Sequence, residues 1–164
     1  MEASEFFLQT ATLIKEYFPG QFRLKKDQLT GEATFYRAYP ERNLILNVHI
    51  PIIHNTPDSI HFAKKKLITV FVARNTKTCL ELRPSRIITG WESVLKEKIA
   101  IVKSTIDDMK RCIICNDYPI PKMSMTMKRN AQGTKFVSYY CPRCRKYFNS
   151  TYGVYLKSIL HKYL

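Results

Sequence analysis

Apolar side chains recur at three- and four-residue steps between Ala3 and Phe18, and Pro19-Gly20 interrupts the pattern. This spacing gathers the apolar side chains on one face of an α-helix, and a proline-glycine pair commonly ends a helix. The sequence therefore predicts an amphipathic helix at the start of the chain. We expect its buried face to consist of Phe6, Phe7, Thr10, Leu13, Ile14 and Tyr17.

Alternation of apolar and polar residues follows this helix and is typical of strands with one buried face. The alternation is clearest in residues 33–39 and 44–50, which flank the turn Pro40-Glu41-Arg42-Asn43 and are predicted to form a hairpin. We expect the strands to form an antiparallel sheet. Further strands are predicted at 21–26, 67–73 and 78–83, with a long irregular connection over 51–66.

A second stripe with helical spacing follows Thr89-Gly90 and predicts a helix that packs on the sheet. Residues 1–110 are therefore predicted to form an α+β domain with an N-terminal helix, an antiparallel sheet and a packing helix. This second helix runs into Arg111-Cys112, so a smaller module, 111–164, is expected to follow it with almost no linker. The stripe consists of Leu95, Ile99, Val102, Ile106 and Met109.

Length and composition describe an ordinary globular chain. Of the 164 residues, 45% are hydrophobic and 24% are charged, which provides enough apolar material for a modest core. No apolar run approaches the ~18 residues of a membrane span, and the first residues lack the basic stretch of a secretory signal. We therefore expect a soluble intracellular protein, cytoplasmic or nuclear, without a membrane span.

Four of the five cysteines form two C-x-x-C pairs, Cys112-Ile-Ile-Cys115 and Cys141-Pro-Arg-Cys144. In a reducing compartment such pairs usually bind metal rather than form disulfides. Two pairs together supply the four thiolates of a tetrahedral Zn²⁺ site. We predict one structural zinc ion, held by Cys112, Cys115, Cys141 and Cys144. A rubredoxin-like iron site would use the same sulfurs, whereas a RING domain would need eight ligands, more than this segment offers.

The 25 residues between the two pairs predict a hairpin, with strands at 122–128 and 134–140 around a turn at 130–133. This arrangement resembles the zinc-ribbon family, notably the ribbons of topoisomerases and transcription factors, over about residues 110–149. Apolar residues at helical spacing predict a terminal helix over 151–164, packed on the ribbon or on the first domain.

Positive charge is concentrated in the last third of the chain. Residues 111–164 contain ten lysines and arginines but a single acidic residue, Asp117, whereas residues 1–110 contain 17 basic and 12 acidic residues. A net charge of +9 on a short segment favours a polyanionic partner, and aromatic rings between the cations could stack on unpaired bases. We therefore expect the ribbon to bind nucleic acid, DNA or RNA. The candidate contacts are Lys122, Lys128, Arg129, Lys135, Tyr139, Arg143, Arg145 and Lys146.

Residues 3–109 resemble ubiquitin-conjugating enzymes and their inactive RWD relatives. The segments that carry the resemblance are Leu44-Ile-Leu-Asn-Val-His-Ile-Pro51, Pro57-Asp-Ser-Ile-His-Phe62 and Cys79-Leu-Glu-Leu82. The resemblance implies a thioester-forming role for Cys79. However, the Tyr-Pro and His-Pro-Asn motifs of that family are absent, and Ile68-Thr-Val-Phe-Val-Ala73 stands where the second is expected. The alternative is that Cys79 is a small hydrophobic core residue.

These features favour a non-enzymatic protein with two parts. The α+β domain would serve as a scaffold or a protein contact, and the basic zinc ribbon would bind nucleic acid within a transcription, replication or other nucleoprotein complex. Two alternatives stay open. One is a ubiquitin-conjugating-like domain, active or inactive, whose ribbon recruits a partner. The other is an assembly subunit whose basic ribbon binds an acidic protein.

Overall fold

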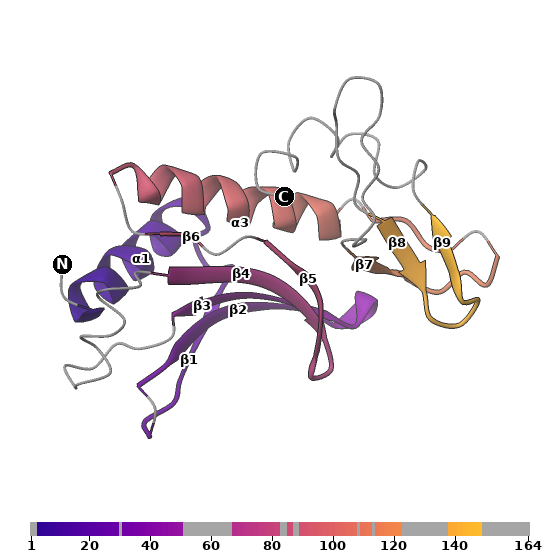
Figure 1. The fold of residues 1–164 in the computed structure, drawn as a ribbon, viewed down its shortest axis with the longest axis horizontal. Helices are drawn as coiled ribbons and strands as arrows, with labels where there is room; N and C mark the ends of the chain where they lie inside the picture. The colour runs from indigo at the N-terminus through magenta and orange to yellow at the C-terminus, as the bar shows by residue number, and fades with distance from the viewer. Residues whose placement is uncertain are drawn as a thin grey trace. The chain divides into compact units, whose positions relative to one another are not determined.

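The computed structural model describes residues 3–29, 31–50, 67–82, 85–86, 89–107, 109–112, 114–122 and 138–148. Over these residues the fold is α+β, as predicted (Figure 1). The helices are α1 (Ala3–Tyr17), the short 3₁₀ helix η1 (Pro40–Arg42) and α3 (Trp91–Asp107). The strands are β1 (Arg23–Lys26), β2 (Ala33–Tyr39), β3 (Leu44–Ile50), β4 (Leu67–Arg74), β5 (Lys77–Glu81), β6 (Ser85–Arg86), β7 (Ile120–Lys122), β8 (Ser138–Cys141) and β9 (Lys146–Phe148).

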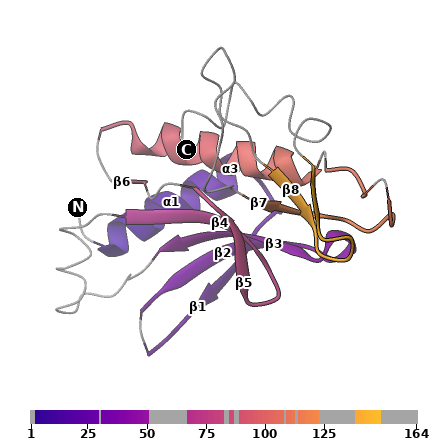
Figure 2. The ribbon, with the colours of Figure 1, turned by 45° about the vertical axis from the view of Figure 1, so that its right-hand side comes forward.

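The larger sheet has the strand order β1-β2-β3-β4-β5, and β6 pairs with β4. Strand β1 pairs with β2, and β4 pairs with both β5 and β6, in each case antiparallel. Strand β3 alternates buried and half-buried residues along its whole length, so the predicted alternation is confirmed there. Figure 2 shows how β4 turns back into β5, and a register shift between Val72 and Ala73 interrupts their pairing.

By its internal contacts the chain divides into two compact units. The first contains residues 1–37, 47–70 and 83–99, and the second contains 38–46, 71–82 and 100–164. Strands β2, β3 and β4 and helix α3 each contribute residues to both units. The module with the cysteine pairs therefore belongs to the same compact unit as the turn between β2 and β3 and the hairpin of β4 and β5.

Aromatic contacts hold the core of the first unit together. The Phe6 ring of α1 lies 4.6 Å from the ring of Trp91, the first residue of α3. The Phe7 ring stacks on Phe35 of β2, with 5.6 Å between the centroids. Helix α1 thus packs against both the start of α3 and a strand of the sheet. Burial of these rings is a large source of stability, because each aromatic side chain removes much apolar surface from water.

The predicted helix faces are confirmed with one exception. Thr10 is buried with its hydroxyl donating to the carbonyl of Phe6 at 2.9 Å, so its burial leaves no unsatisfied donor. Tyr17 was expected in the core but is 46% exposed. It is the last residue of α1, and the ammonium of Lys96 lies 3.7 Å from its ring centroid.

Of the apolar stripe of α3, Leu95, Ile99, Val102 and Ile106 are fully buried and Met109, just beyond the helix, is nearly so.

The smaller sheet has the order β7-β8-β9 and is antiparallel throughout. Its register places Ile120 opposite Tyr140 and Cys141 opposite Lys146. The predicted hairpin turn and most of its two strands lie outside the described residues, as do the predicted connection over 51–66 and the predicted terminal helix.

Among the helices that the structure describes, none combines the length and the apolar character needed to cross a membrane.

Candidate metal centre

The four predicted ligands gather in one place. The Sγ atoms of the four cysteines all lie within 4.8 Å of one another. The Sγ atoms of Cys112 and Cys144 are 3.9 Å apart, and those of Cys115 and Cys141 are 3.5 Å apart. A tetrahedral ion with four sulfurs at about 2.3 Å requires sulfur–sulfur distances of about 3.8 Å. The cluster therefore fits a single four-coordinate metal ion.

Both cysteine pairs form the same backbone turn, which we call a knuckle: Cys112–Asn116 is the first and Cys141–Arg145 the second. In each, the amide of the last residue donates to the carbonyl of the first, at 2.9 Å in the first knuckle and 2.8 Å in the second. The last residue adopts a left-handed conformation, with φ of 65° at Asn116 and 55° at Arg145. An amide also donates to the first sulfur of each knuckle, from Ile114 at 3.4 Å and from Cys144 at 3.5 Å.

These amide donors have an electrostatic effect on the thiols. Burial raises the pKa of Cys112, but hydrogen bonds from the backbone of Cys115 and Ile114 outweigh it and lower this pKa to about 7. A hydrogen bond with Cys115, together with burial, raises the pKa of Cys144 to about 12. Burial likewise raises the pKa of Cys141. Neighbouring thiols thus resist joint ionisation, and a bound cation must displace their protons.

The cluster is not uniformly accessible. Cys112 and Cys141, the first cysteine of each knuckle, are buried, whereas Cys115 and Cys144 are half-buried. All four coordination positions of a tetrahedral ion would be filled by protein sulfur. A site of this kind holds a fold together and leaves no position for a substrate.

Comparisons with family models, with curated proteins and with solved structures found no match to this chain. Its function is therefore inferred from the geometry and charge of the site.

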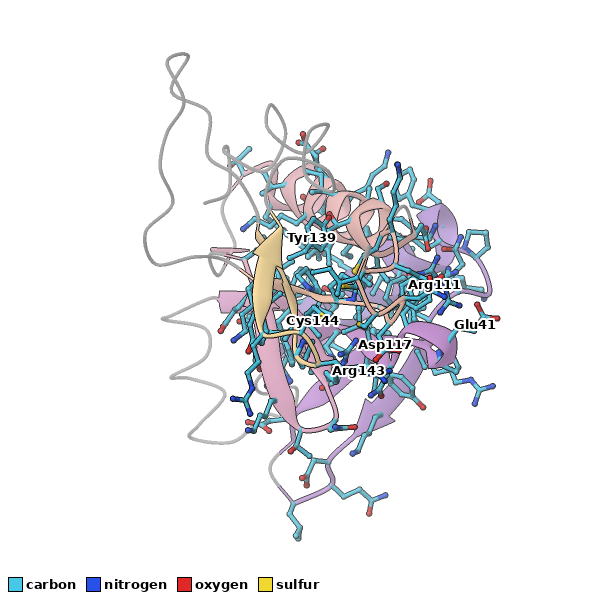
Figure 3. All side chains as sticks on the ribbon, turned by 90° about the vertical axis from the view of Figure 1, so that its right-hand side faces the viewer. Glu41, Arg111, Asp117, Tyr139, Arg143 and Cys144 are labelled. Atoms are coloured by element: carbon cyan, nitrogen blue, oxygen red, sulfur yellow. The ribbon has the colours of Figure 1, made fainter. Side chains whose placement is uncertain are left out.

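A polar contact joins the second knuckle to Asp117, the residue that follows the first knuckle. The guanidinium of Arg143 lies 3.5 Å from the carboxylate of Asp117, and both side chains are exposed (Figure 3). The carbonyl of Asp117 accepts from the amide of Cys112 at 2.6 Å. Arg111 donates to the carbonyl of Asn116 at 3.1 Å. The exposed ion pair contributes at most about 1 kcal/mol, so it adds little to the stability of the centre.

The predicted nucleic-acid contacts divide into four groups. Arg143 and Arg145 are exposed on the second knuckle. Lys122 is half-buried with its ammonium 5.2 Å from the ring centroid of Tyr140. Tyr139 is fully buried, which corrects its prediction as a stacking contact, because a ring without exposed surface cannot meet a base. The others are Lys146, of which only the backbone is described in β9, and Lys128, Arg129 and Lys135, which lie outside the described residues.

Sequence reasoning missed Arg74, at the end of β4. Its guanidinium donates to the carbonyls of Arg42 at 2.9 Å and Asn43 at 3.1 Å, and to those of Tyr118 at 3.2 Å and Pro119 at 3.5 Å. The sequence shows only one arginine after an apolar strand, 38 residues before Cys112. Nothing in that pattern points to the metal centre.

Cys79 lies outside the sulfur cluster. Its thiol is half-buried and donates to the carbonyl of Val72 at 3.3 Å. Burial raises the pKa of Cys79, although the positive charge of Arg74 acts in the opposite direction. A protonated thiol that donates to a backbone carbonyl is a poor nucleophile, because the thiolate is the reactive form.

We expect Cys79 to resist thiol labelling in the metal-loaded protein at pH 7.5. The reagent would be a maleimide, and the modified positions would be identified by mass spectrometry. The same reaction in denaturant, where all five cysteines are accessible, sets the maximum. Rapid, stoichiometric labelling of Cys79 in the native protein would instead support a catalytic thiol.

Proposed function

We propose that this protein binds nucleic acid through a zinc-stabilised ribbon and acts as an accessory component of a nucleoprotein complex. Zinc is the metal that best suits the site, because closed tetrahedral sites with four cysteine ligands are typical of structural Zn²⁺. Such an ion has no redox chemistry and serves only to hold the strands β7, β8 and β9 around the two knuckles.

The observation that carries the proposal is the conformation of Arg145. A residue other than glycine in the left-handed region costs roughly 1–2 kcal/mol, although asparagine tolerates it. The first knuckle has Asn116 at this position, whereas the second has an exposed arginine with φ of 55°. Costly backbone conformations tend to occur at functional sites. The guanidinium of Arg145 therefore supports a role that requires positive charge at the tip of the second knuckle.

The charge balance supports the same partner. A Zn²⁺ ion with four thiolates carries −2, so residues 111–164 retain a net charge of about +7 after metal binding. Phosphates are neutralised by such a surface without regard to sequence. Because Tyr139 is buried, we expect phosphate contacts to dominate and base selectivity to be low.

The proposal predicts binding that weakens steeply with salt. The zinc-loaded full chain would be titrated against labelled single- and double-stranded oligonucleotides at 50 and 200 mM salt, using fluorescence anisotropy. Three or four phosphate contacts with duplex predict a loss of affinity of about 40- to 150-fold between these two concentrations. Arg145→Gly should weaken binding several-fold and reduce the salt slope by about 1.

Asn116→Gly is the matched control for Arg145→Gly. It places glycine at the equivalent left-handed position of the other knuckle without removing a charge, so it should bind like the wild type. No binding at 50 mM salt, salt-independent binding, or equal behaviour of the two variants would contradict the proposal. Tighter binding to polyglutamate than to an oligonucleotide of equal charge would favour an acidic protein as the partner.

A further inference from the structure

Arg74 ends β4 and belongs to the same compact unit as the metal module. Its four carbonyl acceptors form two groups that are distant in sequence. Arg42 and Asn43 lie in the turn between β2 and β3, and Tyr118 and Pro119 connect the first knuckle to β7. One guanidinium thus ties the turn of the large sheet to the segment that leads out of the metal centre.

The path from Arg74 to the sulfur ligands is short. Pro119 directly precedes β7, whose three residues all pair with β8. Strand β8 ends at Cys141, the buried first ligand of the second knuckle. On the other side, Tyr118 lies three residues after Cys115 of the first knuckle. A shift of the Tyr118–Pro119 backbone would therefore displace both knuckles relative to each other.

Neighbouring arginines hold the same segment in place. The guanidinium carbons of Arg42 and Arg111 lie 5.2 and 4.4 Å from the ring centroid of Tyr118. Arg42 also donates to the carbonyl of Asp107, at the end of α3, at 3.0 Å. These contacts hold both ends of the segment that connects α3 to β7. Arg74 contacts this segment at Tyr118 and Pro119, directly before β7.

The charge of Arg74 also acts on the centre. Burial lowers the pKa of Arg74, and electrostatic interactions of its half-buried guanidinium with Cys79 first, and then with Cys141 and Asp117, partly offset this effect. Four thiolates around a divalent ion carry a net charge of −2. A guanidinium is attracted to an anionic centre of this kind, and this attraction adds to the hydrogen bonds that Arg74 makes with the connecting segment.

We propose that Arg74 is a positioning residue of the metal centre and couples metal binding to the turn between β2 and β3. This inference rests on the metal centre, and it does not depend on nucleic-acid binding. Because coupling between two sites is reciprocal, a residue of the sheet that tightens metal binding must itself be held more firmly when metal is bound. Residues 38–46 should therefore respond to the metal, although they lie far from the cysteines in sequence.

The first test measures metal affinity in the full chain. Zinc dissociation constants would be obtained by competition with a chromophoric chelator for the wild type, Arg74→Met and Arg74→Lys. Loss of an outer-shell partner typically costs about 10- to 100-fold in metal affinity, which is the effect expected for Arg74→Met. Arg74→Lys keeps the charge but not the fork of donors, so an intermediate loss is expected.

Arg37→Met is the matched control. Arg37 lies in the first unit and donates to Gln21 at 2.6 Å, so its removal should leave zinc affinity within about twofold of the wild type. If Arg74→Met fails to fold, as judged by circular dichroism, Arg74→Lys decides the outcome. Wild-type zinc affinity in Arg74→Lys and in any folded Arg74→Met would overturn the proposal.

Hydrogen exchange provides a readout that a general loss of stability would not reproduce. In the wild type, zinc should slow exchange in residues 38–46, including the amide of Asn43, which donates to Pro40 at 3.2 Å. In Arg74→Lys or folded Arg74→Met at saturating zinc, this slowing should be reduced, while the knuckle amides remain protected. Equal exchange of 38–46 with and without zinc in the wild type would overturn the coupling. Failure of zinc to bind the wild type would overturn this inference and the proposed function together, whereas absent oligonucleotide binding would affect only the latter.

Discussion

Replacement of Cys141 by serine is expected to abolish stoichiometric zinc binding and to unfold strands β7 to β9. Cys141 has no exposed surface, ends β8 and pairs with Lys146 of β9. It is therefore both a predicted metal ligand and a residue of the central strand of the small sheet. A serine hydroxyl does not replace a thiolate as a zinc ligand. Structural zinc sites contribute about 10–16 kcal/mol of binding free energy at pH 7, more than a small module can lose and remain folded.

Metal content after dialysis, measured by plasma mass spectrometry, should fall from one zinc per chain to background in Cys141→Ser. Limited proteolysis should then cleave within residues 111–164. Cys79→Ser is the matched control, since it removes a cysteine outside the cluster and should retain one zinc. A full equivalent of zinc in Cys141→Ser would refute the four-cysteine centre.

The second large effect is expected in the first unit, where Phe6→Ala should lower the free energy of unfolding by about 3–5 kcal/mol. Phe6 is fully buried, and its ring lies 4.6 Å from Trp91. Its removal leaves a cavity between α1 and the start of α3 that neither helix can close without moving. Urea unfolding would be followed by the fluorescence of Trp91, the single tryptophan of the chain, which reports directly on this contact.

Leu8→Ala tests whether this loss is specific to the core. Leu8 lies on the same helix but is 63% exposed, so the substitution should change the free energy of unfolding by less than about 0.5 kcal/mol. Both variants place alanine in α1 and so share its helix propensity. Equal shifts of the two urea midpoints would show that α1 is not anchored through Phe6.

Periodicity in the sequence was sufficient to predict α1, α3, the strands β1 to β5 and the core positions of β3 and α3, whereas the short strands β6 and β9 were not predicted. It was sufficient because the residues that form the buried face of a helix or strand lie only a few positions apart in the sequence. The metal cluster was predicted for a related reason: each knuckle is a local turn, and only the meeting of two knuckles is a long-range event. The structure confirms that meeting by the sulfur distances.

Predictions that depended on the direction in which a single side chain points were wrong for Tyr139 and Tyr17. Tyr139 and Tyr140 are neighbours on β8, and neighbouring strand residues point to opposite faces of a sheet. One of the two rings therefore had to face the interior, but the surrounding basic residues did not indicate which one. Tyr17 failed differently, because its place at the end of α1 leaves its ring half exposed.

The role of Arg74 could not have been read from the sequence. Its partners are main-chain carbonyls, which every residue possesses, so no pattern of side chains marks them. Its acceptors lie 31 and 32 residues before it and 44 and 45 residues after it. Only the folded arrangement of β4, the turn after β2 and the segment before β7 brings them together.

The four cysteines are unevenly buried, so two sulfurs of the cluster are shielded from solvent and two are partly accessible. Among the four described sulfurs, Cys112 and Cys141 are buried and Cys115 and Cys144 are half-buried, so peroxide, an alkylating agent or a competing chelator should reach Cys115 and Cys144 first. Damage would therefore begin at the second sulfur of either knuckle. A disulfide between these two outer sulfurs, formed with peroxide as the oxidant, would release the ion and leave strands β7 to β9 without the metal that holds them together.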